Sequence, residues 1–492
     1  MREGGGDTEE REGLCGSRFC RGRARDLMRM RPWRLLIALI GSALACAGLS
    51  SGRMAAMADT LKAGAARSNI TPPLGTLLAG SFSARKSVDV HDELHAKALV
   101  LDNGETRIAI VVCDLIAAPR KYLDKSNELI QERCGIPPEN VLISCTHTHT
   151  GPSPCGLLGT PGEPEYMEWA TVKIADSVQL ALNRLQPARL GYGVGREPGQ
   201  VFNRRFRMKD GTVRMNPGRL NPDIVEPVGP TDPDVGVLVV ESTEGEPICL
   251  LANYALHYVG GGRGTSVSAD YFAFFGDAVR KMTGKDFVVM MSNGFCGDIN
   301  NVDVSSETPK GPPYSQAHQV ARILAAEAVK VWKEMQFADE VDLEAALSEI
   351  TVKRRSITAE QVGEAKEKLK TLPDKDVRGR VYANEIIYLS EWPEEEQTWV
   401  QVLAVNDLAL VGCPGEMFVE LGLEIKRRSP AGTTFTIELA NDYAGYIPTV
   451  KAFDEGGYET WFARSSRMVP ETGPQMVEEA CRLLQRLVGS GQ

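Results

Sequence analysis

The chain has 492 residues, of which 43% are apolar and 24% are charged, as in an ordinary globular protein. Its net charge is −10; residues 1–56 carry +4, which leaves −14 for the remainder. An acidic body without a long run of lysines and arginines excludes nucleic acid as the expected partner. The length allows one large core or two to three domains.

Residues 1–56 have the pattern of an N-terminal extension that ends in an export signal. Three arginines between positions 29 and 34 precede an apolar run at 35–49. That run is too short and too rich in small residues for a membrane span. A small-x-small sequence at 43–45 fits signal cleavage just before Cys46, which is also a candidate lipoprotein anchor. We therefore expect an exported protein, either periplasmic or secreted.

The body of the chain, residues 57–492, alternates strand-like and helical segments without an internal repeat. Apolar runs bounded by turn residues predict strands, and amphipathic runs predict helices. Two pairs of strands read as hairpins, so we expect an α/β fold with a mixed central β-sheet and flanking helices. In chain order the expected elements are a strand at 107–113, a helix at 122–132, a strand at 141–144, a helix at 166–185, a hairpin of strands 237–242 and 248–256, a helix at 269–282, a strand at 287–291, helices at 315–335 and 359–372, a hairpin of strands 400–405 and 409–411, a helix at 416–427, a strand at 434–439 and a helix at 475–487.

Polar or glycine-containing clusters follow several of these apolar strands. Sites of open α/β sheets form beyond the carboxyl ends of strands, so the clusters are expected to converge on one pocket. The alternative is that they are ordinary polar loops, but their density of histidine, acidic and tyrosine side chains favours a site. The clusters lie at 146–152, 293–301, 414–416 and 441–446.

The sequence CTHTHTGP at 145–152 is the most informative of these clusters. It contains His147 and His149, two of only six histidines, directly after the apolar run 141–143. Alternate residues of a strand point the same way, so both imidazoles can face one cavity. Neutral imidazole is a common zinc ligand, which makes both histidines candidate ligands. A hydrogen-bonded pair of core histidines is the structural alternative.

Four other residues are candidates only in combination with this motif. His257 ends an apolar strand, where a single histidine is usually structural. Glu416 follows a Pro-Gly pair and opens a predicted helix, where the helix dipole alone favours a carboxylate. Tyr446 and Tyr458 would ordinarily be packing aromatics.

Several classes of enzyme are excluded by missing motifs. The chain has no His-Glu-x-x-His of a metalloprotease and no Gly-Lys-Ser/Thr phosphate loop. Its only Gly-x-Ser-x-Gly, at 48–52, lies in the signal segment and not on a strand-to-helix turn. The His-x-His is not followed by Asp-His, which argues against a metallo-β-lactamase-like site.

The motifs, taken in order, resemble the neutral/alkaline (non-lysosomal) ceramidase family. The resemblance covers nearly all of residues 63–475, and its Thr-His-Thr-His-x-Gly-Pro motif is specific. The matching segments lie at 63–75, 91–92, 145–152, 203–204, 257, 297–298, 414–416 and 441–458.

The resemblance implies a zinc site with catalytic groups around a scissile amide. It implies hydrolysis of ceramide (N-acylsphingosine) or a related N-acyl lipid by metal-activated water, with the peripheral membrane contact that a lipid substrate allows. The implied Zn²⁺ ligands are His147, His257, Glu416 and Tyr446. The implied groups beside the substrate are His149, Arg204 and Tyr458.

Two departures from the family pattern widen the range of functions. Asn300 stands where the family has a substrate-contacting serine; asparagine can hydrogen-bond to substrate but is no ordinary nucleophile, and a zinc-water mechanism survives the change. The chain ends near the close of the catalytic region, so we expect no C-terminal immunoglobulin-like domain. A hydrolase of a different amide and a non-catalytic extracellular binding protein on the same scaffold are the alternatives.

Overall fold

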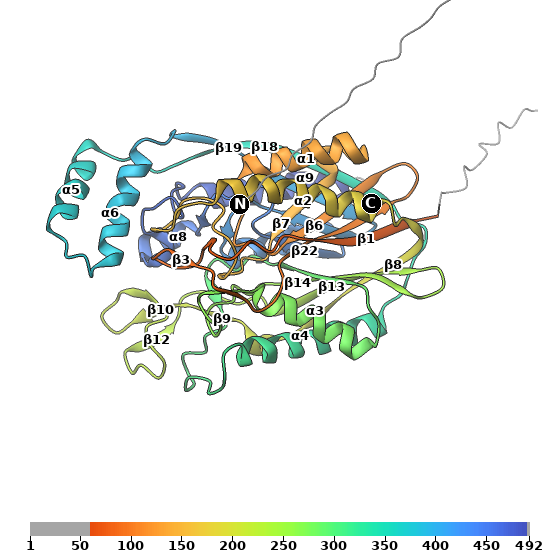
Figure 1. Ribbon diagram of the computed structural model, residues 1–492, viewed down its shortest axis with the longest axis horizontal. Coiled ribbons are helices and arrows are strands. Elements are labelled where there is room, and N and C mark those ends of the chain that lie inside the picture. Colours follow the sequence, from red (N-terminus) through yellow and green to blue (C-terminus); the bar gives the residue numbers. More distant parts are fainter. Residues whose placement is uncertain (1–59, 490–492) are drawn as a thin grey trace, which may run out of the picture. The chain divides into compact units, whose positions relative to one another are not determined.

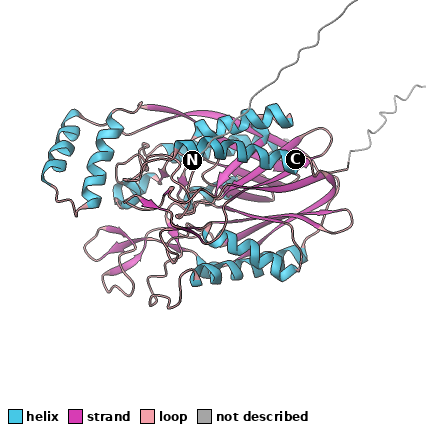
Figure 2. Ribbon diagram, in the orientation of Figure 1, coloured by secondary structure: helices cyan, strands magenta, loops and turns pink. Residues whose placement is uncertain are grey.

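The computed structural model describes residues 60–489, so the predicted extension with Cys46 lies outside the described residues. None of the helices within 60–489 combines the length and the hydropathy that a bilayer crossing requires. Within residues 60–489, two large β-sheets, the helices that cover them and five small sheets of two or three strands make up the fold (Figures 1 and 2). The expected α/β class with a mixed sheet is confirmed, and a second sheet adds to it.

The larger sheet has eight strands and is mixed. Strands β14 and β16 are parallel, as are β6 and β7, and every other neighbouring pair is antiparallel. Its order is β16 (Val288–Asn293), β14 (Pro247–Tyr254), β13 (Asp234–Ser242), β8 (Gln186–Arg196), β1 (Lys62–Asn69), β5 (His95–Asp102), β6 (Arg107–Cys113) and β7 (Val141–Cys145).

A second sheet of four strands packs face to face on the first. Its order is β18 (Leu343–Lys353), β19 (Glu395–Val405), β20 (Leu408–Gly412) and β22 (Thr433–Ile437), of which β20 and β22 are parallel. Side chains of both sheets share one buried apolar cluster, to which Ile110 contributes from the larger sheet and Leu410 and Phe435 from the smaller. Burial of these fully covered side chains stabilises the pairing of the two sheets.

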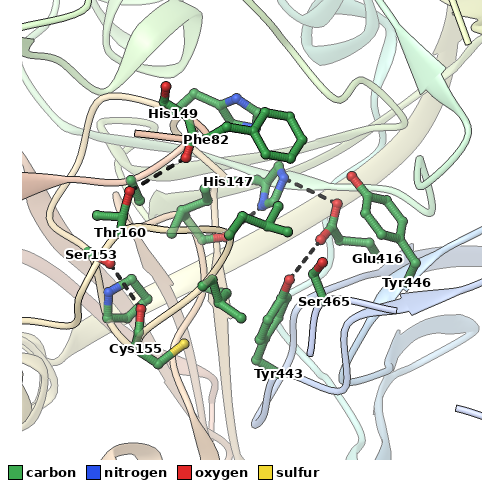
Figure 3. A pocket seen from close by; sticks show the side chains of 18 of the residues that line it. Phe82, His147, His149, Ser153, Cys155, Thr160, Glu416, Tyr443, Tyr446 and Ser465 are labelled. Carbon is green, nitrogen blue, oxygen red and sulfur yellow. Dashed lines mark hydrogen bonds and ion pairs between the residues drawn. The ribbon is translucent and has the colours of Figure 1, made fainter. Parts of the chain in front are cut away.

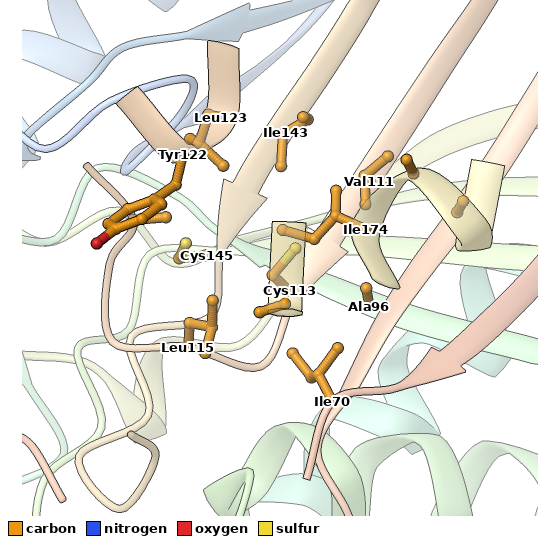
Figure 4. Packing of buried hydrophobic residues seen from close by; sticks show 14 of the residues in the cluster. Ile70, Ala96, Val111, Cys113, Leu115, Tyr122, Leu123, Ile143, Cys145 and Ile174 are labelled. Atoms are coloured by element: carbon orange, nitrogen blue, oxygen red, sulfur yellow. The ribbon is translucent and has the colours of Figure 1, made fainter. Parts of the chain in front are cut away.

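Helices cover the two outer faces, so the fold has four layers in the order α, β, β, α. The side chains of β6 alternate between the two faces of the larger sheet. Ile110 points toward the smaller sheet, whereas Val111 and Cys113 point away from it, into a cluster with Tyr122 and Ile174 of the helices (Figure 4). The larger sheet carries α1 (Arg120–Cys134), α2 (Pro164–Leu182), α3 (Asp270–Thr283) and α4 (Ser315–Glu334), and the smaller carries α7 (Val419–Arg428) and α9 (Thr472–Leu487).

A helical hairpin, α5 (Ala359–Thr371) and α6 (Val377–Ser390), connects β18 to β19 and projects from the sheet (Figure 1). Helix α5 starts at a capping box in which the Thr358 and Gln361 side chains each bind the other residue's backbone N–H. The remaining elements are α8 (Val450–Glu455), three 3-10 turns at Pro138–Asn140, Pro198–Gln200 and Tyr458–Thr460, and the short strands β2 (Leu77–Leu78), β3 (Arg85–Lys86), β4 (Asp89–Val90), β9 (Phe202–Asn203), β10 (Arg205–Met208), β11 (Val213–Met215), β12 (Ile224–Pro227), β15 (Ser266–Val267), β17 (Ile299–Asn300), β21 (Glu416–Met417) and β23 (Tyr446–Ile447).

The predicted elements are confirmed with small shifts at their ends, with one exception that concerns the site. The helix predicted to open at Glu416 begins at Val419, and Glu416 lies in β21 instead. Its backbone N–H donates to Gly445 O at 2.9 Å, and β21 pairs in parallel with β23 so that Glu416 stands opposite Tyr446. That prediction was wrong because pairing with a segment 30 residues later offers the backbone a better partner than a helix turn.

Candidate active site

The two sheets meet at the end where the histidine motif follows β7. Asn441 N–H donates to Ile143 O at 2.8 Å, and Ile143 N–H donates to Asn441 Oδ1 at 3.0 Å. Through these bonds the turn after β22 is fixed beside the turn after β7. Polar clusters from both sheets therefore converge, as the sequence predicts.

Three histidines form the centre of this convergence. The side-chain nitrogens of His147, His149 and His257 lie within 4.8 Å of one another, and the ring centroids are 4.4 to 5.0 Å apart. His257 Nε2 lies 3.0 Å from His149 Nε2, so at least one of these nitrogens is unprotonated. His147 and His257 are 5% and 1% exposed. A buried group of this composition can hold a metal ion.

Backbone contacts fix the direction in which His147 points. Its Nδ1 donates to Ile116 O at 2.6 Å, which leaves Nε2 free to face the site. Its own N–H donates to Leu115 O at 2.9 Å, and the residue adopts φ +64°, which L-residues rarely occupy. Such a conformation persists only where surrounding contacts impose it, and it is common in functional sites.

Glu416 faces the histidines from β21, which follows the strand β20 of the smaller sheet. Its Oε2 lies 3.3 Å from His147 Nε2 and 3.8 Å from His257 Nδ1, while Oε1 accepts a hydrogen bond from Tyr443 OH at 3.1 Å (Figure 3). Oε2 is buried and receives no hydrogen bond, although burial of a carboxylate oxygen without a donor is costly. Tyr446 lines the same cavity beside Glu416. The carboxylate is therefore oriented for a cation.

Burial and the neighbouring charges set the charge states of the three histidines and Glu416. Burial lowers the pKa of His149 to about 3 and that of His257 well below its usual value, helped by His147, so both imidazoles are neutral. Burial disfavours the charged form of His147, but the Glu416 carboxylate outweighs it and raises the pKa of His147. Burial also works against ionised Glu416, but His147 outweighs it and holds the pKa of Glu416 below its usual value.

Asp270 positions the second motif histidine. Its Oδ2 accepts from His149 N–H at 3.1 Å and from Thr148 Oγ1 at 3.0 Å, and Oδ1 lies 3.5 Å from Thr150 Oγ1. Asp270 is the first residue of α3, so its hydrogen bonds join the N-terminus of this helix to the loop that carries His149. Burial raises the pKa of Asp270 to about 7. Asp270 gave no signal in the sequence, because its partners lie more than a hundred residues earlier.

Arg204 approaches the histidines from the opposite side to Asp270. Its Nε donates to Glu459 Oε1 at 2.7 Å, Nη1 lies 3.2 Å from His257 Nδ1, and Nη2 is buried without a partner. Its Cζ lies 5.4 Å from the ring centroid of Tyr446 and 5.9 Å from that of Tyr458. Burial and the Glu416 charge raise the pKa of Tyr458 to about 12, against the opposing effect of Arg204.

Asn300 does not line the cavity, and unlike His257 and Arg204 it makes no hydrogen bond to another predicted site residue. It is 1% exposed; its Nδ2 donates to Asn216 Oδ1 at 3.1 Å and its Oδ1 accepts from Val302 N–H at 2.9 Å. Its side chain therefore holds the turn after β17, and its catalytic role stays a prediction.

No residue of the predicted cluster at 293–301 lines the cavity. The cluster instead holds neighbouring segments of the site in place. Burial raises the pKa of Asp298 to about 6, and its carboxylate accepts from Val419 N–H at 2.9 Å and from Asn203 Nδ2 at 2.8 Å. Burial likewise raises the pKa of Glu438 to about 8; this residue accepts from Cys296 N–H at 3.0 Å and from Met417 N–H at 3.2 Å. These carboxyl groups tie β21 and α7 to the rest of the site.

A cavity of about 110 Å³ opens beside the histidines and Glu416 (Figure 3). Its walls are mainly apolar, and Glu416 is the only carboxylate among them. They include segments for which the sequence gave no functional signal. These are the loop Ala79–Gly80–Ser81–Phe82, Ile116 and Ala117 after β6, and the loop from Ser153 to Thr160.

Gly80 presses against His149 and offers a test of its placement. It has φ +83°, and a Cβ there would lie 2.6 Å from His149 Cβ and 2.7 Å from His149 O. We expect Gly80→Ala to displace His149 and lower kcat of any reaction at this site by about 100-fold, since a misplacement near 1 Å costs that much. Gly75→Ala is the matched control, since Gly75 has φ +94° but open space around its Cβ position. Equal losses in both variants would contradict this role of His149.

The residues present fit a bound zinc ion. The imidazoles of His149 and His257 are neutral, a buried oxygen of Glu416 faces His147 and His257, and the phenol of Tyr446 lies beside that carboxylate. Nitrogen and oxygen donors in this number are typical of zinc sites. One ring nitrogen of His149 also lies within 4.8 Å of those of His147 and His257, so the geometry does not decide whether His149 is a metal ligand.

Comparison with known proteins supports the fold. No protein-family description matches the chain. The structure is similar to neutral ceramidase from Pseudomonas aeruginosa, with a TM-score of 0.67 and 19% identity over 87% of this chain and 75% of that one. It is also similar to a ceramidase complexed with C2, with a TM-score of 0.66 and 17% identity over 87% of this chain and 76% of that one. The chain therefore has the fold of the neutral ceramidases.

Proposed function

We propose that this protein is an exported, zinc-dependent amidohydrolase that resembles neutral ceramidase and cleaves the amide of ceramide or a related N-acyl lipid. His147, His257, Glu416 and Tyr446 hold the metal in this proposal. The shared fold and the donors gathered at one cavity support it.

One observation carries the proposal. Glu416 Oε2 is buried without a hydrogen-bond donor, yet it faces His147 Nε2 at 3.3 Å and His257 Nδ1 at 3.8 Å. A pair of core histidines with a purely structural role would satisfy that oxygen with a donor. The unsatisfied oxygen therefore favours a metal site over the structural alternative.

The surrounding residues suit hydrolysis of an amide. A bound zinc ion would lower the pKa of its water and polarise the amide carbonyl. Because burial lowers the pKa of His149 to about 3, its imidazole stays neutral and can donate a hydrogen bond from its ring N–H to the developing oxyanion. The free Nη2 of Arg204 and the hydroxyl of Tyr458 can donate hydrogen bonds to the oxyanion. The apolar walls of the cavity can hold part of an acyl chain and exclude water.

Two alternatives make different predictions. A hydrolase of another amide would leave ceramides of every chain length uncleaved while it cleaves a simpler N-acyl amide. A non-catalytic binding protein, which Asn300 in place of serine keeps open, would bind zinc without any hydrolysis that a chelator stops.

Removal of the metal tests the proposal directly. We expect the purified protein to contain about one zinc per chain and a chelator to abolish N-acyl amide hydrolysis, with recovery on addition of Zn²⁺. Because a ligand bound only by the folded state stabilises it by about 4 kcal/mol at a thousand times its Kd, the metal-free protein should also melt at a lower temperature. Hydrolysis that persists at full rate in metal-free protein would refute the proposal.

A further inference from the structure

Four aromatic rings in mutual contact extend outward from the cavity and form what we term the aromatic collar, composed of Phe82, Tyr382, Tyr458 and Trp461. Phe82 and Tyr458 line the cavity, with ring centroids 6.4 Å apart. Tyr382 of α6 packs on Phe82 at 6.2 Å, and Trp461 lies 5.5 Å from Tyr382 and 5.9 Å from Tyr458. Trp461 is 40% exposed, so the collar reaches from the cavity to solvent.

Arg378, in the first turn of α6, lies against this collar. Its Cζ is 5.2 Å from the ring centroid of Phe82 and 4.7 Å from that of Trp461. Stacking on two aromatic faces restrains the guanidinium at the mouth of the cavity. Within residues 60–489 no carboxylate lies within ion-pair distance of Arg378. Its positive charge is therefore not neutralised by the protein.

A second arginine adds to this positive potential. Arg85 donates from Nη2 to Ala79 O at 2.7 Å and to His149 O at 3.2 Å, and in the described part of the chain it too has no carboxylate within ion-pair distance. Burial lowers the pKa of Arg85, and Asp270 opposes this only at longer range. Arg204, by contrast, is paired with Glu459 at 2.7 Å.

The collar leaves the binding edges of Arg378 available. A guanidinium stacked by its faces still presents N–H groups around its edge, and these match the oxygens of a carboxylate, sulfate or phosphate. An ordinary surface arginine is held by a carboxylate or moves freely in water. Arg378 is held between Trp461 and Phe82, and because Phe82 lines the cavity, the position of Arg378 is tied to that of the substrate.

We propose that the amide substrate of this site carries an anionic group that rests at the mouth of the cavity against Arg378, while its apolar half enters the cavity. The inference rests on the proposed amidohydrolase function and narrows its substrate to anionic N-acyl compounds, of which N-acyl amino acids are the simplest. Ceramide, which is neutral, would be the poorer substrate.

The test compares two substrates of nearly equal size on the zinc-loaded enzyme. N-decanoylglycine carries a carboxylate where N-decanoylethanolamine carries a neutral hydroxyl. We expect the larger kcat/KM for N-decanoylglycine, and we expect Arg378→Gln to lower it by about twofold to fivefold, the range for an exposed ion pair. The same variant should leave kcat/KM for N-decanoylethanolamine unchanged, and higher ionic strength should reduce the preference in the wild type.

Lys375→Gln is the matched control, because it removes one positive charge from the turn before α6, where Lys375 is exposed and makes no contact with the collar. Lys375→Gln should leave kcat/KM unchanged for both N-decanoylglycine and N-decanoylethanolamine. Equal rates on the two substrates in the wild type, or equal losses in Arg378→Gln, would overturn the inference. It would also be overturned if Arg378→Gln weakened only the binding to vesicles that contain anionic lipid.

A binding measurement separates this inference from the proposed function. If neither these two amides nor ceramide is cleaved, the amidohydrolase proposal fails, and calorimetric titration with N-decanoylglycine still tests the anion site. Tighter binding of N-decanoylglycine than of N-decanoylethanolamine, lost in Arg378→Gln and kept in Lys375→Gln, would support the anion site. Binding that is the same in all three proteins would refute it.

Discussion

Glu416→Ala is expected to remove zinc and hydrolysis together. The carboxylate stands 3.3 Å from His147 Nε2 and 3.8 Å from His257 Nδ1, so its loss takes away the only carboxylate that lines the cavity. Loss of a group that merely supports a ligand costs about 10-fold to 100-fold in metal affinity, and loss of a ligand should exceed this. Metal analysis of purified protein, beside His147→Ala, measures the effect.

Three further variants make the result specific. Glu416→Gln keeps the shape and the acceptor for Tyr443 OH, so it should fold normally and still lose most zinc affinity. Glu424→Ala removes an exposed glutamate from α7 and should retain a full complement of zinc. His149→Ala decides the role that geometry leaves open: retained zinc with lost hydrolysis assigns His149 to the substrate, whereas lost zinc assigns it to the metal. Near-stoichiometric zinc in Glu416→Ala would refute the ligand assignment.

Glu459→Ala is expected to destabilise the protein by about 3–5 kcal/mol, the cost of removing one partner from a buried ion pair. Glu459 is fully buried and pairs with Arg204 at 2.7 Å and Arg205 at 3.4 Å. Its removal leaves two buried guanidinium groups without this carboxylate. Arg204 would then lose its orientation toward His257, so hydrolysis should fall as well. Denaturant titration of the folded protein measures the stability change.

Comparison with a surface pair isolates the effect of burial. Glu395 pairs with Lys353 at 3.4 Å, but both side chains are more than half exposed, so Glu395→Ala should cost at most about 1 kcal/mol. Glu459→Gln keeps an acceptor for Arg204, so its loss of stability should lie between the losses in Glu459→Ala and Glu395→Ala. A loss in Glu459→Ala no larger than in Glu395→Ala would show that the buried pair contributes little.

Sequence patterns predicted the site better where the chemistry is local than where it depends on contacts between distant segments. His147 and His149 are readable because two imidazoles follow an apolar strand. The same reasoning placed Glu416 near them but on a helix, since its pairing with Tyr446 across 30 residues is invisible locally. Gly80 and Asp270 act on the motif only through the tertiary fold, and no pattern in their own neighbourhoods indicates it.

The elements that were missed have weak or misleading local patterns. Strand β1, with the sequence KAGAARSN, is built largely of small residues that are poor strand formers, although it lies in the middle of the larger sheet. In α6 the buried residues Val381, Glu385 and Leu389 are spaced four apart, but the middle one is a carboxylate that binds Arg464, so the apolar pattern of the helix is interrupted. In both elements the neighbouring structure, and not the periodicity of the segment, determines the conformation.

The way in which the α5–α6 hairpin joins the smaller sheet makes this hairpin, which carries Arg378 and Tyr382, an exchangeable module. The chain leaves the sheet at Lys353 and returns at Glu395, and these two residues are paired partners in the β18–β19 ladder. A tight turn at the same place would close the ladder equally well, so the length and sequence of residues 354–394 are free of the constraints that fix the sheet. Evolution can therefore change Tyr382, Arg378 and the groups they present to a substrate while His147, His257 and Glu416 stay as they are.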